Sequence, residues 1–163
     1  MHLRTTGRER VIHATVTVPA SRDAVWDAWT TEAGLRSFFA PDCTVELEPM
    51  GAYELFFDLD ADEGLRGGEG NVVLAIEPKR MLSFTWNAPP RLPSVRDQRT
   101  SVVVRFRDLP NDRTQVTLTH SGWGEGPNWT KAYDYFVEAW SETVLPRLKK
   151  RFVSGPVDWN ARR

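Results

Sequence analysis

The feature that most constrains the fold is a long C-terminal segment with bulky apolar residues at helical spacing. From Pro127, a favoured first-turn residue, to about Phe152 a helix would span ~35–40 Å at 1.5 Å per residue. Side chains three and four residues apart share one helix face, and here they are Trp129, Tyr133, Phe136, Val137, Trp140 and Val144. Such a face needs a broad concave partner, which a strongly bent sheet would supply. Pro146 lies inside the segment and is expected to bend or break the helix locally.

The segments before this helix supply the strands. Residues 10–18 alternate and stop at Pro19, and two helices are predicted next, one capped by Ser21 and one over about 31–39. Six strands then follow at 43–48, 53–58, 71–77, 81–87, 99–108 and 114–120. Because no helices separate these strands, an antiparallel sheet is favoured. The predicted fold class is α+β, and the proline-rich stretch 88–98 is expected to be irregular.

The length and the net charge of the chain limit the class of protein. At 163 residues, the chain is predicted to form a single domain over 1–163, with a core at about 10–152 and polar tails. The net charge of -1, with mixed signs along the chain, argues against a nucleic-acid surface. No signal peptide or membrane-spanning run is visible, so a cytoplasmic protein without membrane insertion is expected.

The residue types that bind metals are poorly represented. Cys43 is the only cysteine, which excludes an intramolecular disulfide and a multi-cysteine metal site. His2 and His13 do not combine with His120 into a ligand set, and the acidic, glycine-rich loop 58–70 lacks the closing glutamate of a calcium loop. We therefore predict neither a metal nor a cofactor.

Two polar residues are candidates for chemistry. Alternation places His120 at the end of the last strand, on the same face as Val116 and Leu118. It is either a structural histidine bonded to a loop backbone or a ligand-orienting or acid/base group working with Tyr133. No nucleophile with its base and orienting group is visible, which favours a protein that is not an enzyme. A bent sheet covered by the long helix can leave a cavity between them. Phe38 and Phe39 are candidate gate residues of this cavity, and we expect one ring to face the cavity and the other to face the outside.

Several motifs, in order, resemble the START-like (SRPBCC, helix-grip) superfamily. They are Val25-Trp26-Asp27-Ala28-Trp29-Thr30, residues 35–41 and Pro49-Met50-Gly51-Ala52-Tyr53. The stretch from Glu77 to Trp86 resembles the P-x-R-L-x-F-T-W motif of the branch related to the activator of the heat-shock-protein-90 ATPase. Residues 117–123 resemble that branch's closing strand, so the likeness covers about 10–152. It implies a curved antiparallel sheet wrapped around the long C-terminal helix, in the order β-α-α-β6-α.

The resemblance also carries expectations about function. Members of the superfamily bind apolar ligands between the sheet and the long helix, and a few are cyclases or hydrolases. The chain departs from the branch at Phe38-Phe39-Ala40-Pro41, where a tryptophan pair before Gly-Pro is common, so the pocket entrance is expected to differ. Branch members of this length lack the additional N-terminal domain with which the eukaryotic co-chaperone engages its chaperone, and the same is expected of this protein.

Three functions are therefore weighed. The first is a binding protein for an apolar small molecule, with candidate ligand-binding residues Phe38, Phe39, Trp86, Val104, Phe106, His120, Trp123, Tyr133, Phe136, Val137 and Trp140. The second is a small cyclase or hydrolase that uses His120 and Tyr133. The third is a co-chaperone-like stress-response protein that contacts a chaperone through its outer surface. A homodimer is compatible with all three.

Overall fold

A five-stranded antiparallel sheet dominates the computed structural model, which describes residues 10–162. Its strand order is β1-β7-β6-β5-β4, and a separate pair is formed by β2 with β3. The strand bounds are β1 Ile12–Val18, β2 Asp42–Val45, β3 Tyr53–Phe56, β4 Val73–Glu77, β5 Met81–Trp86, β6 Thr100–Leu109 and β7 Arg113–Ser121. The helix bounds are α1 Arg22–Thr30, α2 Glu32–Arg36, α3 Pro93–Arg96, α4 Pro127–Glu138, the π-helix η2 Ala139–Val144, α5 Leu145–Ser154 and the 3-10 helix η3 Asn160–Arg162.

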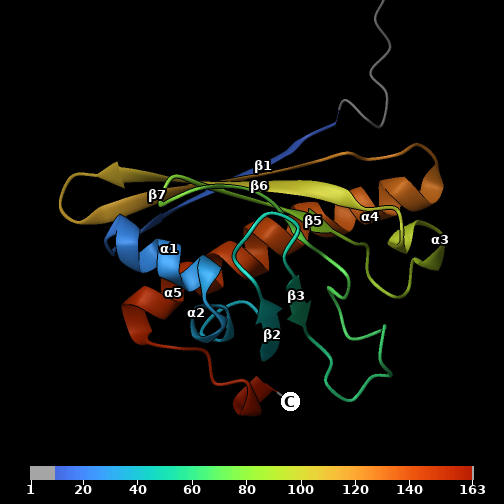
Figure 1. Ribbon diagram of the computed structural model, residues 1–163, viewed down its shortest axis with the longest axis horizontal. Coiled ribbons are helices and arrows are strands. Elements are labelled where there is room, and N and C mark those ends of the chain that lie inside the picture. Colours follow the sequence, from blue (N-terminus) through green and yellow to red (C-terminus); the bar gives the residue numbers. More distant parts are fainter. Residues whose placement is uncertain (1–9, 163) are drawn as a thin grey trace, which may run out of the picture.

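The helices lie on one side of the curved sheet (Figure 1). Helix α1 begins where the Ser21 hydroxyl accepts a hydrogen bond from the backbone N–H of Ala24, as the sequence predicts. The same helix packs on β6 and β7, while the C-terminal helix packs along β1. This arrangement confirms the predicted α+β helix-grip fold.

Two predictions about the connections need correction. The predicted strands at 43–48 and 53–58 do not join the large sheet, because β2 and β3 pair with each other. The segment before β3 contacts the start of β4 through a bridge between Ala52 and Val72 and through backbone hydrogen bonds of Met50 and Gly51 with Val73. The stretch 88–98, predicted to be irregular, contains the one-turn helix α3. That helix starts at Pro93, whose missing N–H costs nothing at the first turn of a helix.

The C-terminal helix is interrupted ahead of Pro146, which confirms the predicted break. Between α4 and α5 the chain forms the π-helical turn η2, in which the N–H of Leu145 bonds to the carbonyl of Trp140. The predicted buried stripe is wrong at Val137, whose side chain is 41% exposed. Val137 follows the buried Phe136 and is rotated about 100° from it, so it lies beside the stripe. The small Ala132, four residues before Phe136, completes the buried face instead.

Phe38 and Phe39 are both buried, so the prediction that one faces outward is wrong. They lie in a tight turn after α2, where the backbone N–H groups of both residues bond to the carbonyl of Leu35. Such a turn does not send neighbours to opposite sides as a strand does. The ring of Phe38 packs 5.2 Å from Trp29, and that of Phe39 packs 5.7 Å from Trp86.

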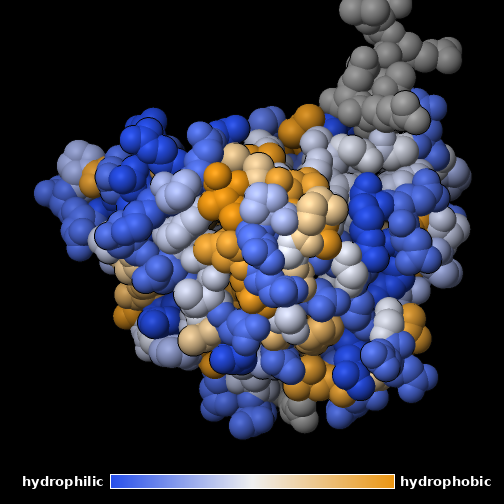
Figure 2. Space-filling view, viewed as in Figure 1, coloured by the Kyte–Doolittle hydropathy of each residue, from blue (hydrophilic) through white to orange (hydrophobic). Residues whose placement is uncertain are grey.

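Most of the face shown in Figure 2 is polar, with smaller apolar areas among the polar residues. Apolar residues gather near the centre of that view. Leu47, Met50 and Leu74 are exposed in the segment after β2 and in β4. None of the helices in the described part of the chain is long and apolar enough to span a membrane.

Candidate functional site

A groove of about 650 Å³ lies between the C-terminal helix and the chain segments that follow β3 and β5. It is walled by residues 57–67, by residues 86–91 and by the helix between Tyr135 and Arg147. Its lining residues are Phe39, Phe57, Asp58, Leu65, Arg66, Gly67, Trp86, Asn87, Ala88, Pro89, Pro90, Arg91, Tyr135, Phe136, Glu138, Ala139, Trp140, Thr143, Val144 and Arg147. Ligand sites in proteins commonly enclose about 300–1,000 Å³, so a small molecule would fit.

Three buried aromatic rings form the base of the groove. The ring centroids of Phe39, Trp86 and Trp140 lie 5.7–5.8 Å from one another, in tilted or edge-to-face arrangements. Aromatic pairs favour such separations and orientations. Phe57 and Tyr135 add partly exposed rings at the rim. The base comes from three segments far apart in the sequence.

The π-helical turn forms part of the helical wall of the groove. Within η2, the residues Ala139, Trp140, Thr143 and Val144 all line it. These four residues are spaced i, i+1, i+4 and i+5, so they lie on one side of the helix. The interruption ahead of Pro146 is therefore part of the groove wall.

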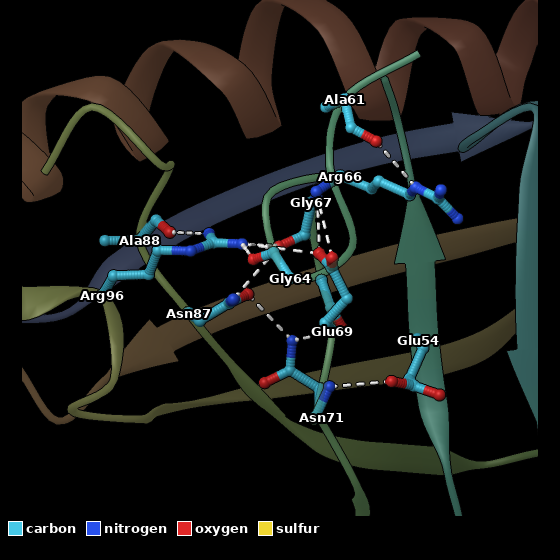
Figure 3. Close-up of polar contacts among 12 residues, drawn as sticks. Glu54, Ala61, Gly64, Arg66, Gly67, Glu69, Asn71, Asn87, Ala88 and Arg96 are labelled. Atoms are coloured by element: carbon cyan, nitrogen blue, oxygen red, sulfur yellow. Dashed lines mark hydrogen bonds and ion pairs between the residues drawn. The ribbon is translucent and has the colours of Figure 1, made fainter. Parts of the chain in front are cut away.

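Arg96 fastens the two loop walls together. Its side chain is only 8% exposed, and its guanidinium donates to the carbonyl of Ala88 and to those of Gly64 and Gly67 at 2.8 and 3.0 Å. Figure 3 shows these bonds converging on one guanidinium group. A fourth contact, of 3.4 Å, reaches the carboxylate of Glu69.

Glu69 organises the acidic, glycine-rich loop from within. Its carboxylate accepts backbone hydrogen bonds from Arg66 at 3.0 Å and Gly67 at 2.7 Å. Burial raises the pKa of Glu69, but these backbone hydrogen bonds outweigh burial and hold it below the ordinary value. The hydrogen bonds of Glu69 and its contact with Arg96 order the loop. The described residues contain no group of three or more His, Cys, Asp or Glu side chains that could hold a metal ion.

A pair of buried asparagines completes the support of the walls. The Asn71 amide donates to the side-chain oxygen of Asn87 at 2.9 Å, and the Asn87 amide donates to the carbonyl of Gly67 at 3.0 Å (Figure 3). Sequence patterns predict no role for Asn71, Asn87 or Arg96, because a single polar residue at the end of a strand or in a loop has no periodic pattern. The only available signal was the glycine and proline content of the two loops.

His120 lies in the core beside the groove and is fully buried. The indole N–H of Trp140 donates to its Nδ1 at 3.0 Å, so that nitrogen carries no proton. Nε2 then carries the proton and bonds to the hydroxyl of Thr100 at 2.7 Å, which donates to the carbonyl of Trp86. Burial lowers the pKa of His120 to about 3. With both ring nitrogens occupied and no exposure, His120 is arranged as a structural histidine.

Tyr133 does not share a solvent-reachable cavity with His120. Its ring packs edge-on against Trp123 at 5.3 Å and lies under the guanidinium of Arg10. Trp123 also contacts the ring of His120, at 4.2 Å. Neither Tyr133 nor His120 lines the groove. This geometry argues against a joint acid/base role for the two.

The predicted ligand-binding residues divide into two groups. Those lining the groove are Phe39, Trp86, Phe136 and Trp140. Those that do not line it are Phe38, Val104, Phe106, His120, Trp123, Tyr133 and Val137. The groove thus lies on the other side of Trp140 from His120, and loop residues make up much of its lining.

Comparisons with known proteins agree with this architecture. The model of the family described as "Activator of Hsp90 ATPase homolog 1-like protein" matches residues 19–152. No protein with a curated description matches the sequence.

Solved structures share the fold at low sequence identity. Protein MLL2253 from Mesorhizobium loti has a TM-score of 0.68 and 20% identity, over 91% of this chain and 100% of that chain. The Aha1 dimer from Colwellia psychrerythraea has a TM-score of 0.63 and 21% identity, over 90% and 98%. CalU16 from Micromonospora echinospora has a TM-score of 0.65 and 22% identity, over 94% and 80%.

Proposed function

Because the chain belongs to the Activator of Hsp90 ATPase homolog 1-like family, whose helix-grip fold it shares, we propose that it is a binding protein for an apolar small molecule. The ligand lies in the groove between the C-terminal helix and residues 57–67 and 86–91. The observation that carries this proposal is the groove of about 650 Å³ with three buried aromatic rings at its base.

The way the groove is built supports this function. Its base is apolar and its walls are held by Arg96 and two buried asparagines, so the space is shaped before any ligand arrives. Preformed, largely apolar pockets with a few polar groups are typical of small-molecule sites. Holding the walls in place also reduces the entropy lost on binding.

Native mass spectrometry of protein purified from its own host tests the proposal. We expect a retained small molecule, released on denaturation. Ala139 lines the groove, so Ala139→Phe fills part of it and should abolish retention. Ala33, an exposed alanine of α2, provides the matched control Ala33→Phe, which should retain the ligand. If Ala139→Phe retains the molecule as well as the control does, the proposed site is wrong.

A further inference from the structure

The rim of the groove carries charged groups of both signs above its aromatic base. Three arginines line it, Arg66, Arg91 and Arg147, together with the carboxylates of Asp58 and Glu138. The described residues show no ion pair that joins either carboxylate to Arg66 or Arg91. Among the lining residues, the arginines outnumber the carboxylates.

Arg66 is positioned to meet a ligand. Its Nε donates to the carbonyl of Ala61 at 3.0 Å, which fixes the plane of the guanidinium group. Figure 3 shows the terminal nitrogens pointing away from the network around Glu69. These nitrogens have no hydrogen bond to residues 10–162. A guanidinium held at Nε can bind a carboxylate through one N–H donor from each of its two terminal nitrogens.

Arg91 lies on the opposite wall. Its guanidinium carbon is 4.7 Å from the ring centroid of Tyr135, a cation–π contact that links the loop after β5 to α4. Arg91 follows Pro89 and Pro90, whose fixed φ angles limit the freedom of this wall. The cation is thus held at the rim and is still exposed to solvent.

We propose that the groove binds a planar aromatic molecule that carries a carboxylate. The rings of the ligand pack on Phe39, Trp86 and Trp140, and its carboxylate bonds to Arg66 and Arg91 at the rim. This inference rests on the proposed binding function and specifies the class of ligand. An aromatic cation, which Asp58 and Glu138 would favour, is the competing class.

Three probes with the same ring system separate these classes: 2-naphthoate, the neutral 2-naphthalenemethanol and the cationic 2-naphthylmethylamine. Binding is measured by isothermal titration calorimetry on the full chain at pH 7. We expect 2-naphthoate to bind about tenfold more tightly than the alcohol. This factor is near the lower end of what a charge-assisted hydrogen bond contributes, because the rim of the groove is exposed to water. The amine should bind most weakly.

Variants of the two arginines test which residues produce the preference for 2-naphthoate. Arg66→Gln and Arg91→Gln should each weaken 2-naphthoate by about threefold or more while leaving the alcohol unchanged. Arg107→Gln, an exposed residue of β6 that does not line the groove, is the control. Because Arg66 also bonds to Ala61, its variant is first compared with wild type by thermal unfolding, and Arg91→Gln provides an independent reading.

The outcomes distinguish the ligand class from the binding function. If all three probes bind equally, or if the amine binds most tightly, the carboxylate proposal is overturned while groove binding stands. If naphthoate is preferred but neither variant changes its affinity, the assignment to Arg66 and Arg91 is overturned. If none of the probes binds and no small molecule is retained in the purified protein, both proposals fail.

Discussion

Replacing Arg96 with methionine removes the clamp between the two walls of the groove. Methionine keeps much of the apolar volume of the side chain and deletes all of its donors, so the change isolates the hydrogen bonds. Four acceptors lose a partner, namely the carbonyls of Ala88, Gly64 and Gly67 and the carboxylate of Glu69.

The loss of stability depends on which other hydrogen-bond donors each acceptor has. Gly67 keeps its bond from the Asn87 amide, Gly64 is exposed to water, and Glu69 keeps two backbone donors. Ala88 is buried, and its carbonyl has no other donor among residues 10–162, so it bears the full penalty of about 1–3 kcal/mol for an unsatisfied buried group. With the weaker losses added, we expect Arg96→Met to cost about 3 kcal/mol.

Thermal unfolding followed by circular dichroism measures this cost. For a chain of this size, 1 kcal/mol shifts Tm by about 2–4 °C, so we expect Tm to fall by about 6–12 °C. Arg107→Met, at an exposed position of β6, should change stability by less than about 0.5 kcal/mol. Arg96→Lys should lie between the two, because an ammonium group cannot span all of the acceptors. A Tm for Arg96→Met within 2 °C of the Arg107→Met control would refute the role assigned to Arg96.

The next predictions concern three single residues, Glu69, His120 and Trp140. The pKa of Glu69 is lowered in the folded protein. Its carboxylate therefore stabilises the fold above about pH 4.5, and this contribution decreases as the pH falls. In urea titrations, the difference in unfolding free energy between wild type and Glu69→Gln should shrink from pH 7 to pH 3.5. The pKa of His120 is lowered to about 3 by burial, so its ring ¹⁵N chemical shifts should remain those of the neutral Nε2–H form from pH 8 to pH 5. A titration of these shifts near pH 6.5 would contradict the hydrogen-bond chain described for His120. Since neutral His120 also stabilises the fold above its unfolded pKa, that contribution should decline as the pH falls from about 6.5 towards 3. Trp140→Phe keeps a ring but leaves the buried Nδ1 of His120 without its donor, which should cost about 1–3 kcal/mol in a urea titration; a cost no greater than that of Phe136→Leu would argue against this bond.

Sequence periodicity predicted the regular elements because their burial is regular. The order of strands and helices, the cap at Ser21 and the break near Pro146 all follow from local patterns that the structure confirms. The same reasoning failed at Val137, because a side chain at the margin of an amphipathic face can be buried or exposed. It failed at Phe38 and Phe39 because their turn follows neither helical nor strand periodicity.

The site was harder to predict than the fold because it is built mostly from irregular chain. Residues 57–67 and 86–91 contribute through backbone carbonyls held by Arg96, and such contacts depend on tertiary position rather than on side-chain pattern. Four of the predicted residues, Phe39, Trp86, Phe136 and Trp140, do line the groove. Trp86, Phe136 and Trp140 were predicted for their inward-facing positions and Phe39 as a gate residue. Burial alone does not distinguish a core ring from a ring at the base of a groove.

Trp140 lies between the packed core around His120 and the groove. Its indole N–H is fixed by His120 on the core side, and its ring also lines the groove. The hydrogen-bond chain continues from His120 through Thr100 to the carbonyl of Trp86, the neighbouring ring of the base. His120 would therefore influence a bound ligand by positioning two of the three rings that the ligand contacts. A His120→Gln variant should accordingly weaken binding of 2-naphthalenemethanol and 2-naphthoate by the same factor, whereas the arginine variants should weaken only the acid. A selective loss of the acid in His120→Gln would refute this division of roles.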